Sequence, residues 1–308
     1  MKDILCIVGP TASGKTALSL ATARRINGEI VSCDSMQIYK GMDIGTAKPT
    51  IEERGGISHH MLDICQPWES YSAARYAREA AACLQALQSR GRTPIIVGGT
   101  GLYLQALVHG LHKDIPDDKG AARAHWTHFV QEYGAEALRR KLAEIDPTSA
   151  ARLPPGDTRR IVRALEVYTQ TGETLTQRHA RTQTAAPRFS VQTVGLRWPR
   201  PVLCARIAQR TDQMLQAGLV EETQRLLRCP LPDNATAIQA IGYREAAAFL
   251  RGELSFAEMR EAILIATRRY AKRQMTWFSN RWSVLWIDAA QEGGDEGILK
   301  ILANKGLL

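Results

Sequence analysis

The stretch "IVGPTASGKTAL", residues 7–18, decides the fold, because it contains the spacing Gly-x-x-x-x-Gly-Lys-Thr between Gly9 and Thr16. The apolar run "DILCIVG" before it predicts a short buried strand, and "KTALSLATARRI" after it predicts a helix. Glycines at both ends let the loop wrap so that backbone N–H groups converge on phosphate oxygens at the positive end of that helix. The stretch therefore predicts a strand, a phosphate-binding loop (the P-loop) and a helix in succession.

The composition of this loop indicates a bound diphosphate. Lys15 supplies a cation, and the Thr16 hydroxyl is a ligand for Mg²⁺, the cofactor that we expect. The residues predicted to bind the diphosphate are Gly9, Pro10, Thr11, Ala12, Ser13, Gly14, Lys15 and Thr16. The pattern leaves open whether a nucleotide or another ester carries that diphosphate.

Further apolar runs extend the pattern beyond the P-loop. "EIVSC" stops at Asp34, "TPIIV" stops at "GGTGLY", and the segment between them, "SAARYAREAAACLQALQSRG", has helical spacing. Strands that alternate with helices predict an α/β fold with a parallel doubly wound sheet, which binds ligands at the carboxyl ends of its strands. The P-loop, Asp34 and Thr100 all lie at such ends.

The middle of the chain has a different hydrophobic pattern from the N-terminal part. From about residue 112 two helical patterns and several proline breaks replace the strand-like runs, until "FSVQTVGLRW" predicts a strand that returns to the sheet. We therefore expect a P-loop α/β core with C-terminal helices at residues 1–111 and 191–308. Residues 112–190 are expected to form a helical insertion domain.

Composition restricts the class of protein. No run of eighteen apolar residues and no leader-like N-terminus occur, so we expect no membrane contact and a cytoplasmic location. The six cysteines are scattered and predict neither a zinc site nor a disulfide framework. The 40 Lys and Arg residues against 31 Asp and Glu give a net charge of +9, which favours a polyanionic partner.

The surroundings of the P-loop argue against a nucleotide hydrolase. Such an enzyme normally holds magnesium with an acid at the end of a neighbouring strand, and here that strand ends in Gly98-Gly99-Thr100-Gly101. The acid at a strand end is instead Asp34, which opens "DSMQIYKGMDIGTAKP", a segment rich in hydrogen-bonding side chains. This arrangement suits a polar aromatic substrate better than a water molecule.

At this point the motifs resemble a known family. "GPTASGKT", "DSMQIYKGMDIGTAKP", "HHMLDI" and "GGTGLY", followed by "DPTSAARLPPGDTRRIVRALEVYTQTG", "GLVEE", "AIQAIGYRE" and "TRRYAKRQMTWF", are similar to the tRNA dimethylallyltransferases of bacterial type, also called tRNA isopentenyltransferases. The resemblance spans nearly the whole chain. One departure is "SNRW" after the final Trp-Phe, where an arginine is expected, and Arg281 is the residue that could replace it.

The resemblance implies a reaction and its participants. A dimethylallyl group is transferred from dimethylallyl diphosphate to the exocyclic amine of the adenine on the 3′ side of the anticodon in tRNA. Asp34 is implied as general base, with Lys15, Thr16 and Thr100 as the other catalytic residues. The insertion is expected to clamp the anticodon stem-loop, and the enzyme is expected to be a monomer.

The residues implied to contact tRNA lie in several segments. They are Asp34, Ser35, Met36, Gln37, Thr100, Arg123, Thr158, Arg159, Arg160, Ile161, Val162, Arg163, Gln239, Ala240, Ile241, Gly242, Tyr243, Arg244, Lys272, Arg273, Gln274, Thr276, Trp277 and Phe278.

Two of these segments read as amphipathic helices. In "DTRRIVRALEVY" we expect Asp157 as the N-cap and an apolar stripe of Ile161, Ala164, Leu165 and Tyr168. The second expected helix covers residues 260–281. Together with Met259, the residue just before it, we expect Ile263, Ala266 and Tyr270 to form its buried stripe. Aromatic side chains among the exposed cations of that helix are suited to stacking on unpaired bases.

Three other functions remain open on the sequence. A small-molecule kinase would use the P-loop for ATP and the insertion as a lid. An isopentenyltransferase acting on free adenine nucleotide would need no macromolecular surface. A noncatalytic RNA-binding module would leave the P-loop without a use.

Overall fold

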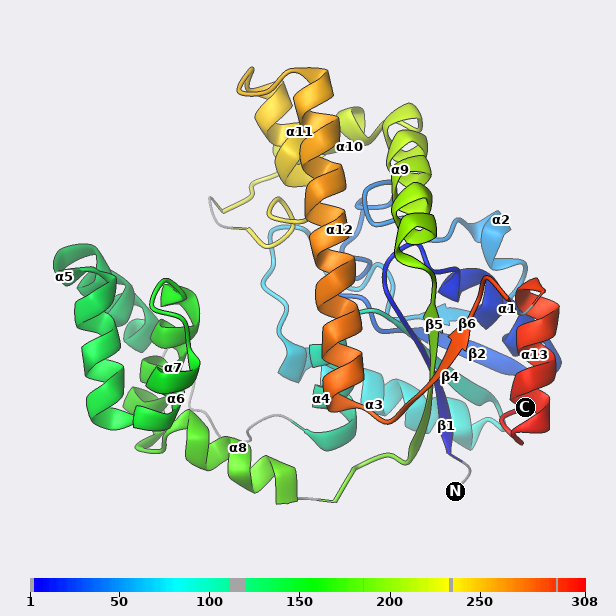
Figure 1. Ribbon diagram of the computed structural model, residues 1–308, viewed down its shortest axis with the longest axis horizontal. Helices are drawn as coiled ribbons and strands as arrows, with labels where there is room; N and C mark the ends of the chain where they lie inside the picture. The colour runs from blue at the N-terminus through cyan, green and yellow to red at the C-terminus, as the bar shows by residue number, and fades with distance from the viewer. Residues whose placement is uncertain (1–2, 111–119, 185, 233–234, 292) are drawn as a thin grey trace. The chain divides into compact units, whose positions relative to one another are not determined.

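The computed structural model describes residues 3–110, 120–184, 186–232, 235–291 and 293–308 (Figure 1). The chain divides into two compact units, one of residues 1–108 with 189–308 and the other of residues 109–188. We describe each unit by itself.

The first unit is built on a six-stranded sheet in which every neighbouring pair is parallel, with strand order β3-β2-β4-β1-β5-β6. Its strands are β1 (Ile4–Val8), β2 (Gly28–Ser32), β3 (His59–His60), β4 (Thr93–Gly98), β5 (Val191–Arg197) and β6 (Val284–Asp288). The predicted parallel α/β fold is confirmed. The sequence did not reveal β3, because a strand of two residues leaves no alternation to detect.

Alternate residues of the strands face opposite layers of helices. In β1, Ile4, Cys6 and Val8 pack with helices α3 (Ala73–Ser89) and α4 (Gly101–His109). Leu5 and Ile7, which point to the other face, pack with α1 (Lys15–Arg25) and α13 (Gly294–Asn304). Because both faces are covered, the central strand β1 is apolar throughout, as is usual for a strand inside a parallel sheet.

A third group of helices follows β5. It comprises α9 (Arg200–Gln216), α10 (Leu219–Leu227), α11 (Tyr243–Leu250) and α12 (Phe256–Arg281), and α9 stands beyond the carboxyl end of β5 in Figure 1. Helices α10 to α12 bury a cluster with the segment after β2, which includes Ile38, Tyr39 and Met42. The short helix α2 (Ile51–Arg54) ends that segment with a capping box at Thr50. Chain far apart in sequence therefore meets above the strand ends.

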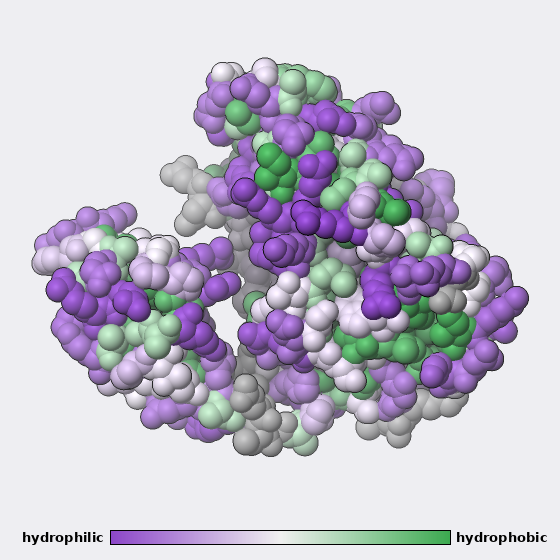
Figure 2. All heavy atoms as spheres, viewed as in Figure 1, coloured by the Kyte–Doolittle hydropathy of each residue, from purple (hydrophilic) through white to green (hydrophobic). Residues whose placement is uncertain are grey.

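The second unit is helical. It contains α5 (Ala121–Ile145), α6 (Pro147–Arg152), α7 (Thr158–Thr171) and α8 (Leu175–Thr184), where the sequence had indicated two helical patterns. A left-handed Gly134 (φ 81°) interrupts α5. Figure 2 shows mainly hydrophilic side chains on the visible face of this unit.

Helix α7 tests the amphipathic pattern read from its sequence. Asp157 caps it by accepting from the Arg160 N–H, as predicted, and Ile161 and Leu165 are fully buried. The stripe was wrong for Tyr168, which is 36% exposed. A tyrosine at the edge of the stripe keeps its polar end in water, so its ring need not enter the core.

Candidate active site

The P-loop has the backbone that its glycines allow. Gly9, Ala12 and Gly14 all have positive φ, of 144°, 63° and 95°. A Cβ at Gly9 would lie 2.9 Å from the Leu196 carbonyl oxygen, so the neighbouring strand leaves no space for a side chain. Helix α1 begins at Lys15, and its first turn, within the described part of the chain, has neither a side-chain cap nor an acidic residue. Its first N–H groups are thus left for an anion.

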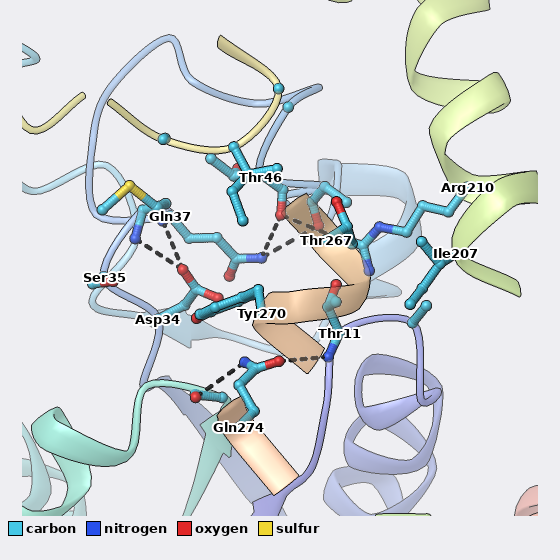
Figure 3. A pocket seen from close by; sticks show the side chains of 18 of the residues that line it. Thr11, Asp34, Ser35, Gln37, Thr46, Ile207, Arg210, Thr267, Tyr270 and Gln274 are labelled. Atoms are coloured by element: carbon cyan, nitrogen blue, oxygen red, sulfur yellow. Dashed lines mark hydrogen bonds between the residues drawn. The ribbon is translucent and has the colours of Figure 1, made fainter. Parts of the chain in front are cut away.

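Side chains from distant helices hold this loop in place. The Gln274 Oε1 atom of α12 accepts from the Thr11 N–H at 2.8 Å, and its Nε2 donates to the Gly99 carbonyl at 3.0 Å (Figure 3). On the other side, Arg206 Nε of α9 donates to the Ala12 carbonyl at 2.8 Å. The two helices therefore fix the P-loop from both sides of its entrance.

A cavity of about 360 Å³ opens beside the P-loop. Its walls come from the P-loop, the segment Asp34–Gln37 after β2, the residues after β4, the segment Gln239–Gly242, and helices α9 and α12 (Figure 3). The structure thus brings together the predicted diphosphate loop and the segment predicted to contact the base. It does so at the carboxyl ends of β1, β2 and β4, where a doubly wound sheet is expected to bind ligands.

Asp34 combines a fixed side chain with a free oxygen. Its Oδ1 accepts from the backbone N–H groups of Met36 at 2.8 Å and Gln37 at 3.3 Å, which closes a turn after β2. Both bonds end on Oδ1, so Oδ2 is left for a partner in the cavity that Asp34 lines. The carboxylate that closes this turn is thus also the predicted general base.

Two cations lie near Asp34 on the side of the P-loop, namely Lys15 and Arg210. Burial, and secondly the neighbouring Arg210 guanidinium, lower the pKa of Lys15 to about 7, while the Asp34 carboxylate opposes this shift. The Lys15 ammonium donates to the Pro10 carbonyl at 2.7 Å. Burial also lowers the pKa of Arg210, which donates to the Thr46 carbonyl at 3.4 Å. Two half-buried cations at the P-loop favour the binding of an anion there.

Thr100 follows the carboxyl end of β4, as predicted, and its hydroxyl holds a neighbouring turn. Its Oγ1 accepts from the Ser35 N–H at 3.0 Å, and among the described residues it lies outside the set that lines the cavity. The lining residue near it is Tyr270, whose pKa is raised, chiefly by burial and then by Asp34. We therefore reinterpret Thr100 as a residue that holds the turn bearing Ser35.

Several residues predicted to contact tRNA have buried side chains, so for them we withdraw a side-chain contact. They are Ile161, Val162, Ala240, Tyr243, Gln274 and Phe278. In each amphipathic segment the implied contact span included core-facing positions together with the exposed ones. The amide of Gln274 is already hydrogen-bonded to two backbone groups of the site, the Thr11 N–H and the Gly99 carbonyl.

The remaining basic residues keep accessible positions. On α12, Lys272, Arg273 and Thr276 are exposed, and the Arg281 guanidinium lies 4.4 Å from the centre of the Trp277 ring. The Arg281 guanidinium therefore packs over the ring of Trp277, one of the aromatic residues of this helix.

In the second unit the arginines of α7 are also accessible. Arg159 and Arg160 are exposed, while Arg163 and the exposed Arg123 both pair with Glu166 at 3.0 Å. These two pairs balance part of the positive charge within the unit itself.

Arg206 and Arg210 are functional candidates that the sequence did not predict. They stand four residues apart in "ARIAQR", and this spacing places both on one face of α9. The signal was therefore present, but nothing in the local pattern indicated that this face would lie against the P-loop.

The described side chains also bear on metals and membranes. Among them there is no group of three or more His, Cys, Asp or Glu residues placed to hold a metal ion. No helix in the described ranges has the length and apolar content of a membrane-spanning segment.

Comparisons with known proteins give a consistent result. A family model described as IPP transferase matches residues 37–281. A tRNA dimethylallyltransferase of Geobacillus thermodenitrificans is 46% identical over 93% of this chain and 90% of the relative, and one of Thermomicrobium roseum is 44% identical over 95% and 88%.

Solved structures agree with these matches. The full-length tRNA isopentenylpyrophosphate transferase of Bacillus halodurans superimposes with a TM-score of 0.73 at 40% identity, covering 99% of this chain and 96% of that one. A eukaryotic dimethylallyltransferase described as acting on tRNA gives a TM-score of 0.81 at 28% identity, over 100% of this chain and 80% of that one.

Proposed function

The chain belongs to the IPP transferase family, and we propose that it transfers a dimethylallyl group from dimethylallyl diphosphate to the N6 amine of the adenine on the 3′ side of the anticodon in tRNA. The resemblance inferred from the motifs is confirmed by the family match. The observation that carries the proposal is the cavity in which the P-loop and the free oxygen of Asp34 meet.

The proposed reaction needs a base on one side of the cavity and groups that stabilise the leaving diphosphate on the other. The N6 lone pair attacks C1 of the dimethylallyl group, the C1–O bond breaks with its electron pair going to the diphosphate, and the N6 proton passes to Asp34 Oδ2. The amine is a weak nucleophile, because its lone pair is delocalised into the ring. Proton removal by a positioned carboxylate contributes roughly 100- to 10,000-fold in rate.

Charge develops on the diphosphate as it leaves. The N–H groups at the start of α1 with Lys15 and Arg210 are the groups that would stabilise this charge. Arg210 joins the predicted set because it lines the same cavity and carries a positive charge at the P-loop.

Mg²⁺ fits this arrangement as the proposed cofactor. The Thr16 hydroxyl is exposed at the cavity, and a hard cation commonly binds one such protein oxygen together with phosphate oxygens and water. When bound, the ion would neutralise charge on the departing diphosphate.

The proposed acceptor is a tRNA anticodon stem-loop. Support comes from the exposed Lys272, Arg273 and Thr276 and the half-buried Trp277 on α12, and from the cavity-lining segment Gln239–Gly242. An adenine in a single-stranded loop leaves its stack at a cost of about a few kcal/mol. We propose that the helical unit of residues 109–188 clamps the tRNA, that the protein acts as a monomer, and that it works in the cytoplasm, where its acceptor is found.

The kinase and adenine-nucleotide alternatives predict different acceptors. A kinase would turn over ATP, and an adenylate isopentenyltransferase would modify AMP. Incubation with dimethylallyl diphosphate and either unmodified tRNA or AMP, followed by nucleoside mass analysis, separates these reactions. Mass gain on the adenosine 3′ to the anticodon is the expected result, and its absence with transcripts of several sequences would overturn the proposal.

The role of Asp34 has its own measurement. Asp34→Asn keeps the hydrogen bonds from Met36 and Gln37 to an oxygen but removes the base, so tRNA binding should persist while turnover is lost. A single-turnover rate within about threefold of wild type would exclude Asp34 as the general base.

A further inference from the structure

A buried carboxylate outside the proposed chemistry binds the segment that follows Asp34. Glu222 of α10 is 3% exposed. Its Oε1 accepts from the N–H groups of Ile44 at 3.1 Å and Gly45 at 3.2 Å, and its Oε2 accepts from those of Asp43 at 3.1 Å and Ile44 at 3.0 Å. Its Oε1 also accepts from the Tyr243 hydroxyl at 2.6 Å. A single carboxylate thus satisfies three backbone donors and one phenol.

The two residues after this anchor orient groups in the cavity. Gln37 Nε2 donates to the carbonyls of Thr46 and Ala47, both at 3.3 Å, and Arg210 donates to the Thr46 carbonyl. Gln37 belongs to the segment proposed to contact the adenine, and Arg210 lies beside the P-loop. The loop that Glu222 fixes therefore positions Gln37, which faces the proposed acceptor, and Arg210, which faces the proposed diphosphate.

Tyr243 connects this anchor to another wall of the cavity. It begins α11 directly after the cavity-lining segment Gln239–Gly242 and is fully buried. A Cβ at Gly45 would lie 2.4 Å from the Tyr243 ring, so the loop and the ring are in direct contact. Burial, and secondly the Glu222 charge, raise the pKa of the Tyr243 phenol, which keeps it a donor to the carboxylate.

We propose that Glu222 is a positioning residue, which acts on the transfer reaction by fixing the loop Asp43–Ala47 and through it the Gln37 amide. This inference rests on the proposed function. A charge on Glu222 is required because both of its oxygens face N–H donors, and a glutamine would turn an NH₂ group toward one set of them.

The matched pair of variants is Glu222→Gln and Glu221→Gln. Glu221 is the exposed neighbour on the same helix, so its variant makes the same chemical change without the contacts. At saturating donor and tRNA, Glu222→Gln should lower the single-turnover rate roughly 10- to 100-fold, because it leaves part of the hydrogen bonds to the loop unmade, whereas Glu221→Gln should leave it unchanged.

A double-mutant cycle with Gln37→Ala separates positioning from a general loss of stability. If Glu222 acts through Gln37, then Glu222→Gln should change the rate less than about threefold once Gln37 is already alanine. A full additive loss in that background would overturn the proposal, as would a wild-type rate in Glu222→Gln itself. Activity is expressed per folded molecule, measured by circular dichroism.

If Glu222→Gln does not fold, Tyr243→Phe provides a second test of the same proposal. It removes one of the bonds to Glu222, so a loss of roughly 3- to 10-fold is expected, again much reduced in the Gln37→Ala background. An additive loss for this variant would overturn the proposal in the same way. Failure of the proposed function is distinguishable, because wild-type protein would then leave tRNA unmodified.

Discussion

Replacing Gln274 by leucine should weaken both the fold and the hold on the donor. The leucine fills a similar volume but leaves the Thr11 N–H and the Gly99 carbonyl without their partners at 2.8 and 3.0 Å. Each buried unpaired group costs about 1–3 kcal/mol, so the two together cost about 2–6 kcal/mol, partly offset by the burial of a more apolar side chain. We expect a net loss of about 2–4 kcal/mol in the free energy of unfolding.

Urea denaturation of Gln274→Leu measures this loss, with Ser279→Ala as control. Ser279 is exposed on the same helix, and a surface change of this kind stays within about 0.5 kcal/mol. Because Thr11 belongs to the P-loop, the leucine variant should also bind inorganic diphosphate more weakly than wild type. A loss of stability below about 1 kcal/mol would refute the view that Gln274 ties the P-loop to α12.

Three further outcomes are expected. Arg210→Ala should lower the affinity for dimethylallyl diphosphate roughly 10- to 100-fold in a titration, since it removes a charged partner of the diphosphate, and an unchanged affinity would remove Arg210 from the donor site. The Arg92 hydrogen bond, with help from His60, lowers the pKa of Glu29 below its ordinary value of 4.5, so this carboxylate stabilises the fold above pH 4.5 and the contribution is lost as the pH falls through the lowered pKa. Glu29→Gln should therefore flatten the fall of the urea midpoint with acid below that pH, and an unaltered slope would contradict this. Binding of tRNA should weaken more than about threefold between about 50 and about 200 mM salt, which filter binding can test.

The sequence predicted the parts of the site that local patterns define. The strand, the P-loop and helix α1 follow one another without interruption, and each has its own periodicity or glycine spacing. Asp34 at the end of β2 was also predictable, because parallel strands bring their carboxyl ends to one edge of the sheet. All of these features depend on contacts within short segments or on the general topology of the fold.

The opposite wall of the cavity could not be predicted in this way. Arg206, Arg210 and Gln274 come from helices whose periodicity shows which face is covered but not by what. The family resemblance implied Gln274 as a tRNA contact, whereas its burial depends on two backbone partners 263 and 175 residues away in sequence. Contacts at that separation leave no periodic trace in a single sequence.

Close packing against α12 and against the segment after β2 explains why glycines stand at the end of β4, where a nucleotide hydrolase would have an acid. A Cβ at Gly98 would lie 2.1 Å from the Cys33 carbonyl oxygen, and one at Gly99 would lie 2.0 Å from Gln274 Nε2. At Gly101 a Cβ would lie 2.1 Å from the Trp277 ring of the same helix. A side chain at Gly99 would therefore displace the Gln274 amide that bonds both the P-loop and Gly99. At Gly99 and Gly101, α12 therefore occupies the space that a side chain would need, and among the described residues Asp34, which follows β2, is the acid that lines the cavity beside the P-loop.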